Sequence, residues 1–240
     1  MDGVTQTPGA KMMFLIRRRP SASREELIAH WFANHMPGVI ERQQSSAAAG
    51  KPAARRYIAT VFDPDPQGTS HWDGVAQLWF DEPLPQPPEP HGTRPADSFQ
   101  EMAEPYLPWA TTEYVVLDGG LPVVPLTLNA PFPCTRSGFC KITFLVVAKA
   151  DVDYPAFYRH WLEVHVPNVL ATMQQTGGFR YVVSHSQQPQ KSEYAGMAEL
   201  YFPDQDSWQA FLAALPSDGI DRYIERLEIR RSGTEMIGIP

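Results

Sequence analysis

The stretch KMMFLIRRRPSASREELIAHWFANHMPGVI, residues 11–40, recurs as KITFLVVAKADVDYPAFYRHWLEVHVPNVL, residues 141–170. The two stretches align without a gap, and both contain the pattern His-Trp-x-x-x-His-x-Pro in the same register. A second match, between residues 74–80 and 196–202, continues the repeat downstream. A duplication of this kind predicts two copies of one small unit that pack as a pseudo-dimer within a single chain.

The repeat also predicts the organisation of the chain. We expect a flexible tail at 1–10, the first copy at 11–118, a Pro- and Gly-rich linker at 119–138 and the second copy at 139–240. A second Pro-rich run, residues 81–95, is expected to be a plain surface loop, with a flap over a site as the alternative.

Composition limits the classes of function. The 240 residues are 43% hydrophobic and have a net charge of -7, with no basic run, so nucleic acid is not an expected partner. No apolar stretch approaches the roughly 20 residues that span a bilayer, and the first residues lack a signal-peptide pattern, which predicts a cytoplasmic protein. Cys134 and Cys140 form neither a disulfide framework nor a metal-ligand spacing, so no metal is expected.

Hydrophobic periodicity predicts the same order of elements in each copy. A strand is followed by a helix capped by Ser23 or Asp153, whose side chains accept hydrogen bonds from free backbone N–H groups. The predicted strands are 12–17, 56–62, 75–80 and 113–117, then 142–147, 180–186, 197–202 and 234–239; further helices are predicted at 98–106, 205–215 and 220–230. The order β-α-β-β-α-β predicts an α+β protein of two ferredoxin-like halves, which pack sheet on sheet as a fused dimeric α+β barrel.

The residues that carry this pattern resemble the EthD family of dimeric α+β barrel proteins. The resemblance rests on FLIRRRP and the following HWFANHMP, and on WDGVAQLWF at residues 72–80. Copy 1 has Gln77 where the family pattern and copy 2 have a glutamate, Glu199, and copy 2 has Ala195 where copy 1 has Asp73. The resemblance implies a fused pseudo-dimer, and its members include isomerases, cyclases, cofactor-independent oxygenases and accessory proteins.

His35 and His165 are the first candidates for catalysis. Each lies two residues before a proline that interrupts the helix and frees a backbone carbonyl. That carbonyl could hold one imidazole tautomer, leaving the other ring nitrogen as an acid or base. Trp31 and Trp161 share the helix face and could form a wall for a flat ligand. The alternative is that both histidines are structural.

Copy 2 adds further candidates. His185 shares a strand face with Tyr181, and Glu199 lies among apolar neighbours on the next strand, where it could act as an acid or base. The alternative for Glu199 is a cross-strand salt bridge with Arg180 or Lys141. Three more aromatic residues could line a pocket or belong to the core: Tyr57, Tyr158 and Trp79. His91 is expected to face solvent from its loop.

The sequence therefore favours a cofactor-independent enzyme of the isomerase, lyase or cyclase type, acting on a small apolar aromatic or carbonyl compound by histidine-mediated proton transfer. Copy 2 is the better-equipped half on these residues. The alternatives are a haem-binding or haem-using protein, a non-catalytic ligand-binding or accessory protein, and a cofactor-independent monooxygenase. A small-molecule ligand is the expected partner, and further homodimerisation is left open.

Overall fold

The computed structural model describes residues 4–65, 71–121 and 131–240. The chain forms two compact units, which we name the His35 unit and the His165 unit. Each is assembled from separate stretches of chain. Among the described residues, the His35 unit comprises 8–110, 131–137 and 233–240, and the His165 unit comprises 4–7, 111–121 and 138–232.

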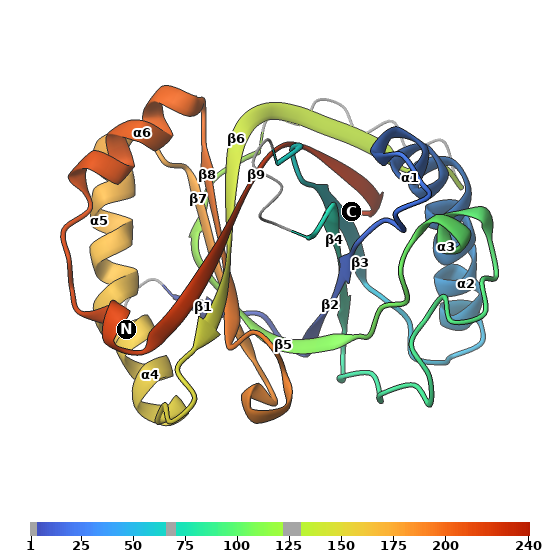
Figure 1. The fold of residues 1–240 in the computed structure, drawn as a ribbon, viewed down its shortest axis with the longest axis horizontal. Helices are drawn as coiled ribbons and strands as arrows, with labels where there is room; N and C mark the ends of the chain where they lie inside the picture. Colours follow the sequence, from blue (N-terminus) through green and yellow to red (C-terminus); the bar gives the residue numbers. More distant parts are fainter. Residues whose placement is uncertain (1–3, 66–70, 122–130) are drawn as a thin grey trace. The chain divides into compact units, whose positions relative to one another are not determined.

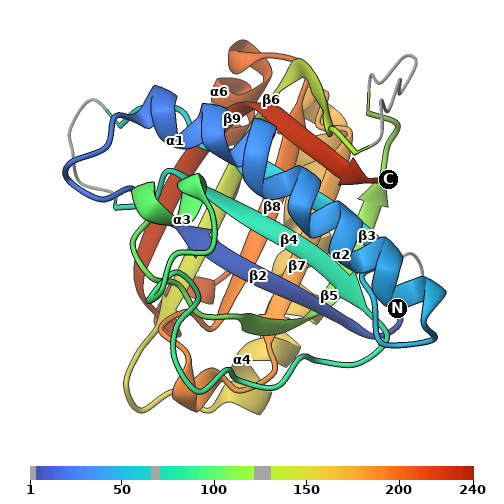
Figure 2. The same cartoon turned by 90° about the vertical axis from the view of Figure 1, so that its right-hand side faces the viewer.

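Antiparallel strands of the His35 unit pair in the order β2-β4-β3-β9. Their bounds are β2 Ala10–Ile16, β4 Gly74–Phe80, β3 Arg56–Val61 and β9 Ile224–Ile239. Only the end of β9, from Thr234 to Ile239, pairs with β3. Helices α1 and α2, Arg24–His30 and Met36–Ala48, run across one face of these strands (Figure 2). Strands therefore form at all four places predicted in copy 1, the fourth being β5 at Trp109–Asp118.

The His165 unit repeats this plan with strands in the order β6-β8-β7-β5-β1. Helices α4, α5 and α6 lie on one side of its strands (Figure 1). The strand bounds are β6 Cys134–Ala148, β8 Gly196–Phe202, β7 Arg180–Ser186, β5 Trp109–Asp118 and β1 Thr5–Gln6. The helix bounds are α4 Tyr154–His160, α5 Val166–Thr176 and α6 Gln205–Ala214. The α+β class is thus confirmed.

The fourth predicted strand of each copy pairs with the other copy. Strand β5, from the end of copy 1, pairs with β7 of copy 2, and the end of β9, from copy 2, pairs with β3 of copy 1. Backbone pairing of this kind satisfies an otherwise open strand edge. The two ferredoxin-like halves and the closed barrel both stay predictions.

The ends of the predicted domains also differ from expectation. The predicted tail contains β1, which pairs with β5, and the Thr7 hydroxyl donates to Glu113 at 2.7 Å. Part of the predicted linker, 122–130, lies outside the described residues, and its last residues belong to β6. The helix predicted at 220–230 is only a short 3-10 turn, Ile220–Arg222, before β9 begins.

The duplicated motif folds as a π-helical turn in both units. Trp31–His35 and Trp161–His165 each connect two α-helices, and the N–H of Met36 donates to the Trp31 carbonyl, five residues back. Pro37 and Pro167 follow in the first turn of the next helix, where their missing N–H is tolerated. The predicted interruption of the helix is a π-turn, a feature often found at functional sites.

The predicted helix caps are confirmed. Ser23 and Glu26 form a reciprocal capping box, and Asp153 accepts from the backbone N–H of Ala156. These caps fix where α1 and α4 begin, and so fix which turn later in each helix presents the tryptophan and histidine to the sheet.

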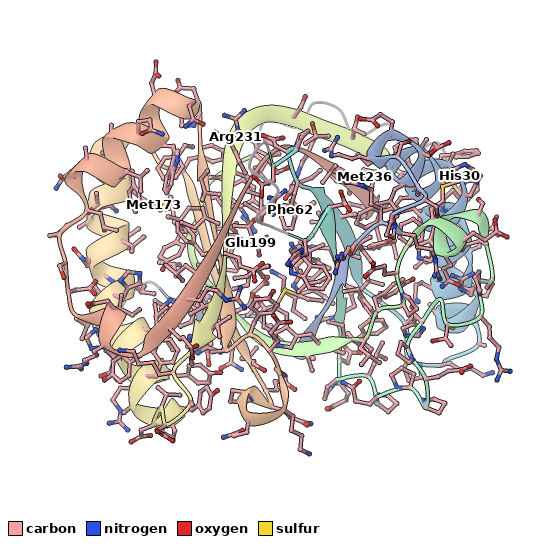
Figure 3. The ribbon with its side chains drawn as sticks, in the orientation of Figure 1. His30, Phe62, Met173, Glu199, Arg231 and Met236 are labelled. Carbon is pink, nitrogen blue, oxygen red and sulfur yellow. The ribbon has the colours of Figure 1, made fainter. Side chains whose placement is uncertain are left out.

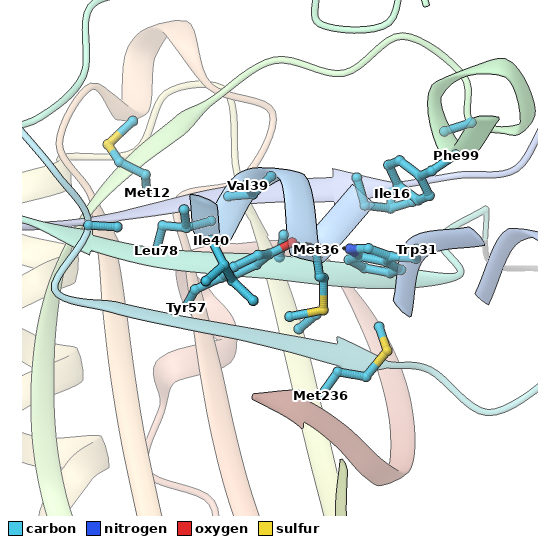
Figure 4. Close-up of a cluster of buried hydrophobic side chains, with 14 of the residues drawn as sticks. Met12, Ile16, Trp31, Met36, Val39, Ile40, Tyr57, Leu78, Phe99 and Met236 are labelled. Atoms are coloured by element: carbon cyan, nitrogen blue, oxygen red, sulfur yellow. Dashed lines mark hydrogen bonds between the residues drawn. The ribbon is translucent and has the colours of Figure 1, made fainter. Parts of the chain in front are cut away.

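Trp31 and Trp161 are the centre of the two cores. Trp31 is 1% exposed and donates from Nε1 to the Tyr57 hydroxyl at 3.2 Å (Figure 4). Gly74 lies beneath the indole, because a Cβ there would come within 2.9 Å of the Trp31 ring and 2.5 Å of the Thr60 carbonyl. Gly196 has the same relation to Trp161, at 3.1 Å. The repeated glycine therefore makes room for the repeated tryptophan.

Candidate functional site

A cavity of about 250 Å³ lies in the His35 unit between the helices and the strands. Its walls are mainly apolar and aromatic, which suits a small, flat molecule. Leu84 and His91, from the Pro-rich run predicted as a plain loop, also line it. Among the residues that line it are Phe14, Trp31, His35, Tyr57, Phe99 and Tyr106.

His35 is one of the residues that line this cavity. Its Nδ1 lies 2.7 Å from Asp97 Oδ2, and its ring packs on Phe99 with centroids 4.5 Å apart. An ionised carboxylate only accepts hydrogen bonds, so this contact assigns the proton of neutral His35 to Nδ1. Nε2 makes no hydrogen bond within the described part of the chain, so it is free to accept a proton.

Asp97 is well held for this role. It is the N-cap of α3, Ser98–Met102, and its Oδ1 accepts from the Gln100 N–H at 2.9 Å. Burial by itself would raise the pKa of Asp97, but hydrogen bonds from His35 and Gln100, with the charges of His35 and Arg42, hold that pKa below its usual value. Asp97 therefore stays ionised and fixes the imidazole.

Two tyrosine hydroxyls also line the cavity. The Tyr57 oxygen accepts from Trp31, and the Tyr106 oxygen accepts from Gln100 Nε2 at 3.3 Å, so each O–H proton remains available to donate. Burial raises the pKa of Tyr57 and raises that of Tyr106 to about 12. Both phenols are therefore neutral donors at neutral pH.

His91 faces solvent, as predicted, and also has a second environment. It is an exposed residue, yet it lines the cavity and lies 5.7 Å from the Tyr106 ring, centroid to centroid. Burial of part of the ring, together with the charge of His35, lowers the pKa of His91. It is thus mainly neutral at the cavity mouth near neutral pH.

The His165 unit contains the same histidine–aspartate pair in a more crowded setting. His165 Nδ1 lies 2.7 Å from Asp218 Oδ2, which also accepts from Asn168 Nδ2 at 2.8 Å. Burial lowers the pKa of His165 even though Asp218 opposes that shift. Helix α6 inserts Trp208 and Phe211 into this core. His165 lines neither the cavity beside His35 nor a second cavity in its own unit.

This second cavity, of about 370 Å³, lies in the His165 unit beside His185. The His185 ring stacks on Tyr158 with centroids 4.1 Å apart and planes 14° apart, and Tyr158 donates to the Ala195 carbonyl at 2.7 Å. His185 Nε2 is buried without a hydrogen-bond partner among the described residues. Burial lowers the pKa of His185 to about 3, which makes this imidazole a poor base at neutral pH.

This burial predicts a pH-dependent stability. Free histidine has a pKa near 6.5, so below that pH the unfolded chain binds a proton that folded His185 rejects until about pH 3. The free energy of unfolding should therefore fall on acidification through this window, by up to roughly 1.4 kcal/mol per pH unit from this group. The variant His185→Phe, which keeps the stack on Tyr158, should flatten the slope measured by urea unfolding between pH 6.5 and 4.5.

The control for that measurement is His71→Gln, which changes an exposed histidine. It should keep the wild-type slope. Equal slopes for wild type and His185→Phe would show that the burial of His185 does not govern acid stability.

The remaining predicted site residues do not gather at either cavity. Glu199 forms an ion pair with Lys141 at 2.6 Å, which is the salt-bridge alternative. Strand alternation places Glu199 on the face of β8 opposite the helix that carries Met173 (Figure 3). Trp79 likewise lies on the face of β4 away from its helices, with Lys11 Nζ 5.1 Å from its ring centroid.

Tyr181 and Trp161 are core residues of the His165 unit. Both are at most 2% exposed, and neither lines the cavity beside His185, although the Trp161 ring lies 5.0 Å from that imidazole, centroid to centroid. Although Tyr181 and His185 belong to the same strand, only His185 lines this cavity. The two aspartates that contact the repeated histidines, Asp97 and Asp218, were not predicted from the sequence. For Asp97 a signal was present, because the pattern Asp-Ser-x-Gln at 97–100 is typical of the start of a helix.

Two general features of the described chain bear on function. Its longest helices are too short and too polar to cross a bilayer. Nowhere in the described ranges do three or more histidine, cysteine, aspartate or glutamate side chains gather as they would around a metal ion.

One segment of the chain matches the model of a known family. The EthD domain matches residues 149–225, which confirms the predicted EthD resemblance there. This family match is consistent with an enzyme or a binding protein for small molecules. No curated protein matches the chain significantly.

Solved structures are similar in fold at low sequence identity. A protein described as "Putative monooxygenase" from Fusobacterium nucleatum subsp. nucleatum is 9% identical, with a TM-score of 0.51 over 95% of this chain and 93% of that one. A chlorite dismutase mutant from Candidatus Nitrospira defluvii is 10% identical, with a TM-score of 0.48 over 94% and 92%. A haem-binding protein from Thermus thermophilus is 12% identical, with a TM-score of 0.42 over 98% and 92%. At these identities the likeness concerns the fold alone.

Proposed function

We propose that the chain is a cofactor-independent enzyme that transfers a proton on a small aromatic or carbonyl compound in the cavity of the His35 unit. The observation that carries this proposal is that His35 lines an aromatic cavity while its Nδ1 is fixed by Asp97 at 2.7 Å and its Nε2 has no hydrogen-bond partner among the described residues. A base held in one tautomer beside a flat pocket is suited to removing a proton next to a carbonyl group. The proposal moves the active half from copy 2 to copy 1.

In the proposed reaction, His35 Nε2 accepts the proton from the carbon next to the carbonyl, and the electron pair of that C–H bond forms an enolate. Asp97 stabilises the imidazolium that results. The hydroxyls of Tyr57 and Tyr106 donate hydrogen bonds to the enolate oxygen, since their own oxygens are already occupied as acceptors. Return of the proton to a different carbon completes an isomerisation, and loss of a leaving group instead completes a lyase reaction.

The direct test is proton exchange in D₂O. A compact neutral ketone, 2-indanone, is incubated with the protein, and loss of its α-proton signal is followed by NMR. The proposal expects exchange above the buffer rate in the wild type and none above it in His35→Gln. Equal exchange in both proteins would show that His35 is not the base. Native mass spectrometry of the purified protein would identify a retained natural ligand.

Haem does not fit the cavity beside His35. The donor arrangement would suit it, because histidine ligands of metals often donate from Nδ1 to a carboxylate. The space does not, because pockets for drug-sized ligands begin at roughly 300 Å³ and haem is larger than such ligands, whereas this cavity is about 250 Å³. A Soret shift with added haem that disappears in His35→Gln would contradict this conclusion.

Oxygenase activity and simple ligand binding are each distinguished from proton transfer by one measurement. A monooxygenase would consume oxygen with its substrate, which an oxygen electrode records. A non-catalytic binding protein would retain ligand without any exchange that depends on His35. No described feature favours either of these functions over proton transfer.

A further inference from the structure

Arg42 lies on α2 and lines the cavity beside His35, together with its neighbour Gln43. Arg42 is an exposed residue, and its guanidinium makes no hydrogen bond or ion pair with any other described residue. Its charge nonetheless acts on Asp97, Tyr57 and Tyr106 and favours the ionised form of each. The cavity therefore has a cation at its edge whose five N–H donors are not used by the protein.

Gly38, one helical turn before Arg42, leaves room for this side chain. A Cβ at position 38 would lie 3.3 Å from Arg42 Nη1, which is closer than most such contacts. The guanidinium therefore lies back over Gly38, on the same helix face as the π-turn that presents His35.

The repeat shows that neither residue is required by the fold. In the aligned positions of copy 2, Gly38 corresponds to Asn168 and Arg42 to Thr172. Asn168 donates to Asp218 at 2.8 Å, and the Thr172 hydroxyl donates to the Asn168 carbonyl at 3.0 Å. The same helical framework thus forms with polar groups that bond to the protein itself. Position 42, which lines the cavity beside His35, carries a guanidinium, whereas the equivalent position 172 carries a threonine hydroxyl.

We infer that the cavity beside His35 selects small aromatic molecules that carry a carboxylate, and that Arg42 binds this carboxylate. The inference deepens the proposed function and rests on it for the substrate class. The planar guanidinium matches a carboxylate in a bidentate contact. Asp97 does not oppose this, because it contacts Nδ1 of His35 and is not among the cavity-lining residues. The apolar walls then hold the ring of the substrate between Arg42 and His35.

The test compares a carboxylate with a neutral molecule of the same shape. Binding of 2-naphthoate and of 2-naphthamide is measured by isothermal titration calorimetry for the wild type and for Arg42→Gln. We expect the variant to bind 2-naphthoate roughly 10- to 100-fold more weakly, the range that corresponds to loss of a hydrogen bond to a charged group. Binding of 2-naphthamide should change less than about threefold, because it does not depend on the charge.

Two further variants support this comparison. Arg94→Gln makes the same change in net charge at a highly exposed arginine outside the cavity, and it should bind 2-naphthoate as the wild type does. Gly38→Asn introduces the copy 2 residue and should weaken 2-naphthoate binding by displacing Arg42. Circular dichroism and thermal melting verify that each variant is folded.

Equal affinity of wild type and Arg42→Gln for 2-naphthoate would overturn the inference, and so would a failure of wild type to bind it at millimolar concentration. The proposed function is tested separately, by the rate at which wild type and His35→Gln exchange the α-protons of the neutral ketone 2-indanone in D₂O. Binding of 2-naphthoate that depends on Arg42 without any such exchange would remove the enzyme proposal and leave an aromatic-acid binding site.

Discussion

Replacing His35 with glutamine is expected to lower the turnover of the natural substrate roughly 100- to 10,000-fold, the usual contribution of a positioned general base. Glutamine keeps much of the volume of histidine and can still donate to Asp97, so the cavity wall is retained. It cannot accept a proton at neutral pH. The measurement is the D₂O exchange rate of 2-indanone, followed by kcat on the natural substrate once native mass spectrometry has identified it.

The repeat provides a matched control for that variant. His165→Gln changes the equivalent residue of the other unit and its bond to Asp218, but His165 lines neither described cavity. Its exchange rate should stay within about twofold of wild type, because the base of the His35 unit is untouched. A loss in His165→Gln as large as that in His35→Gln would contradict the assignment of the active half to copy 1.

Replacing Trp31 with alanine is expected to lower the free energy of unfolding by about 3–5 kcal/mol, the range for removing a large aromatic side chain from a core. The indole is 1% exposed and packs on Phe99, with ring centroids 5.3 Å apart. Its removal also leaves the Tyr57 hydroxyl without its donor. Urea unfolding followed by circular dichroism measures this loss.

Trp161→Ala serves as the comparison, because Trp161 is 2% exposed and also packs on a phenylalanine, Phe157, with ring centroids 5.3 Å apart. It should cost a similar free energy, and Trp31→Phe should cost less than Trp31→Ala because it keeps part of the apolar contact area. A loss below about 1 kcal/mol for Trp31→Ala, well under the range for core aromatics, would show that the cavity walls do not depend on this residue.

Local signals in the sequence predicted much of the fold. The alternation of apolar residues located the strands, and Ser23 and Asp153 marked the helix starts, because both effects act over a few residues. The pairing of β5 with β7 and of the end of β9 with β3 was not predictable in this way. It depends on which sheet edge lies open after folding, and that is a non-local property.

The candidate site was predictable only in part. The repeated motif identified His35 and His165, but not the carboxylates that contact them. Asp97 follows the Pro-rich run and Asp218 follows α6, so the two aspartates are not part of a repeated pattern. Residues 205–214 form α6 and fill the core of one unit, whereas the Pro-rich run of the other unit forms no helix and lines a cavity. The sequence favoured copy 2 as the active half because it contains more polar candidate residues. One of them, Glu199, lies on the strand face away from the helices, because successive side chains of a strand point to opposite faces.

The pairing of β5 with β7 and of β9 with β3 means that each half of the chain covers a strand edge of the other half. A fragment that ends before β9 would lack the strand that covers the edge of β3, and a fragment that begins after β5 would expose the edge of β7. Open edges of that kind promote aggregation. A single copy on its own would need a second molecule to cover these edges, and joining the two copies in one chain makes the pairing independent of protein concentration.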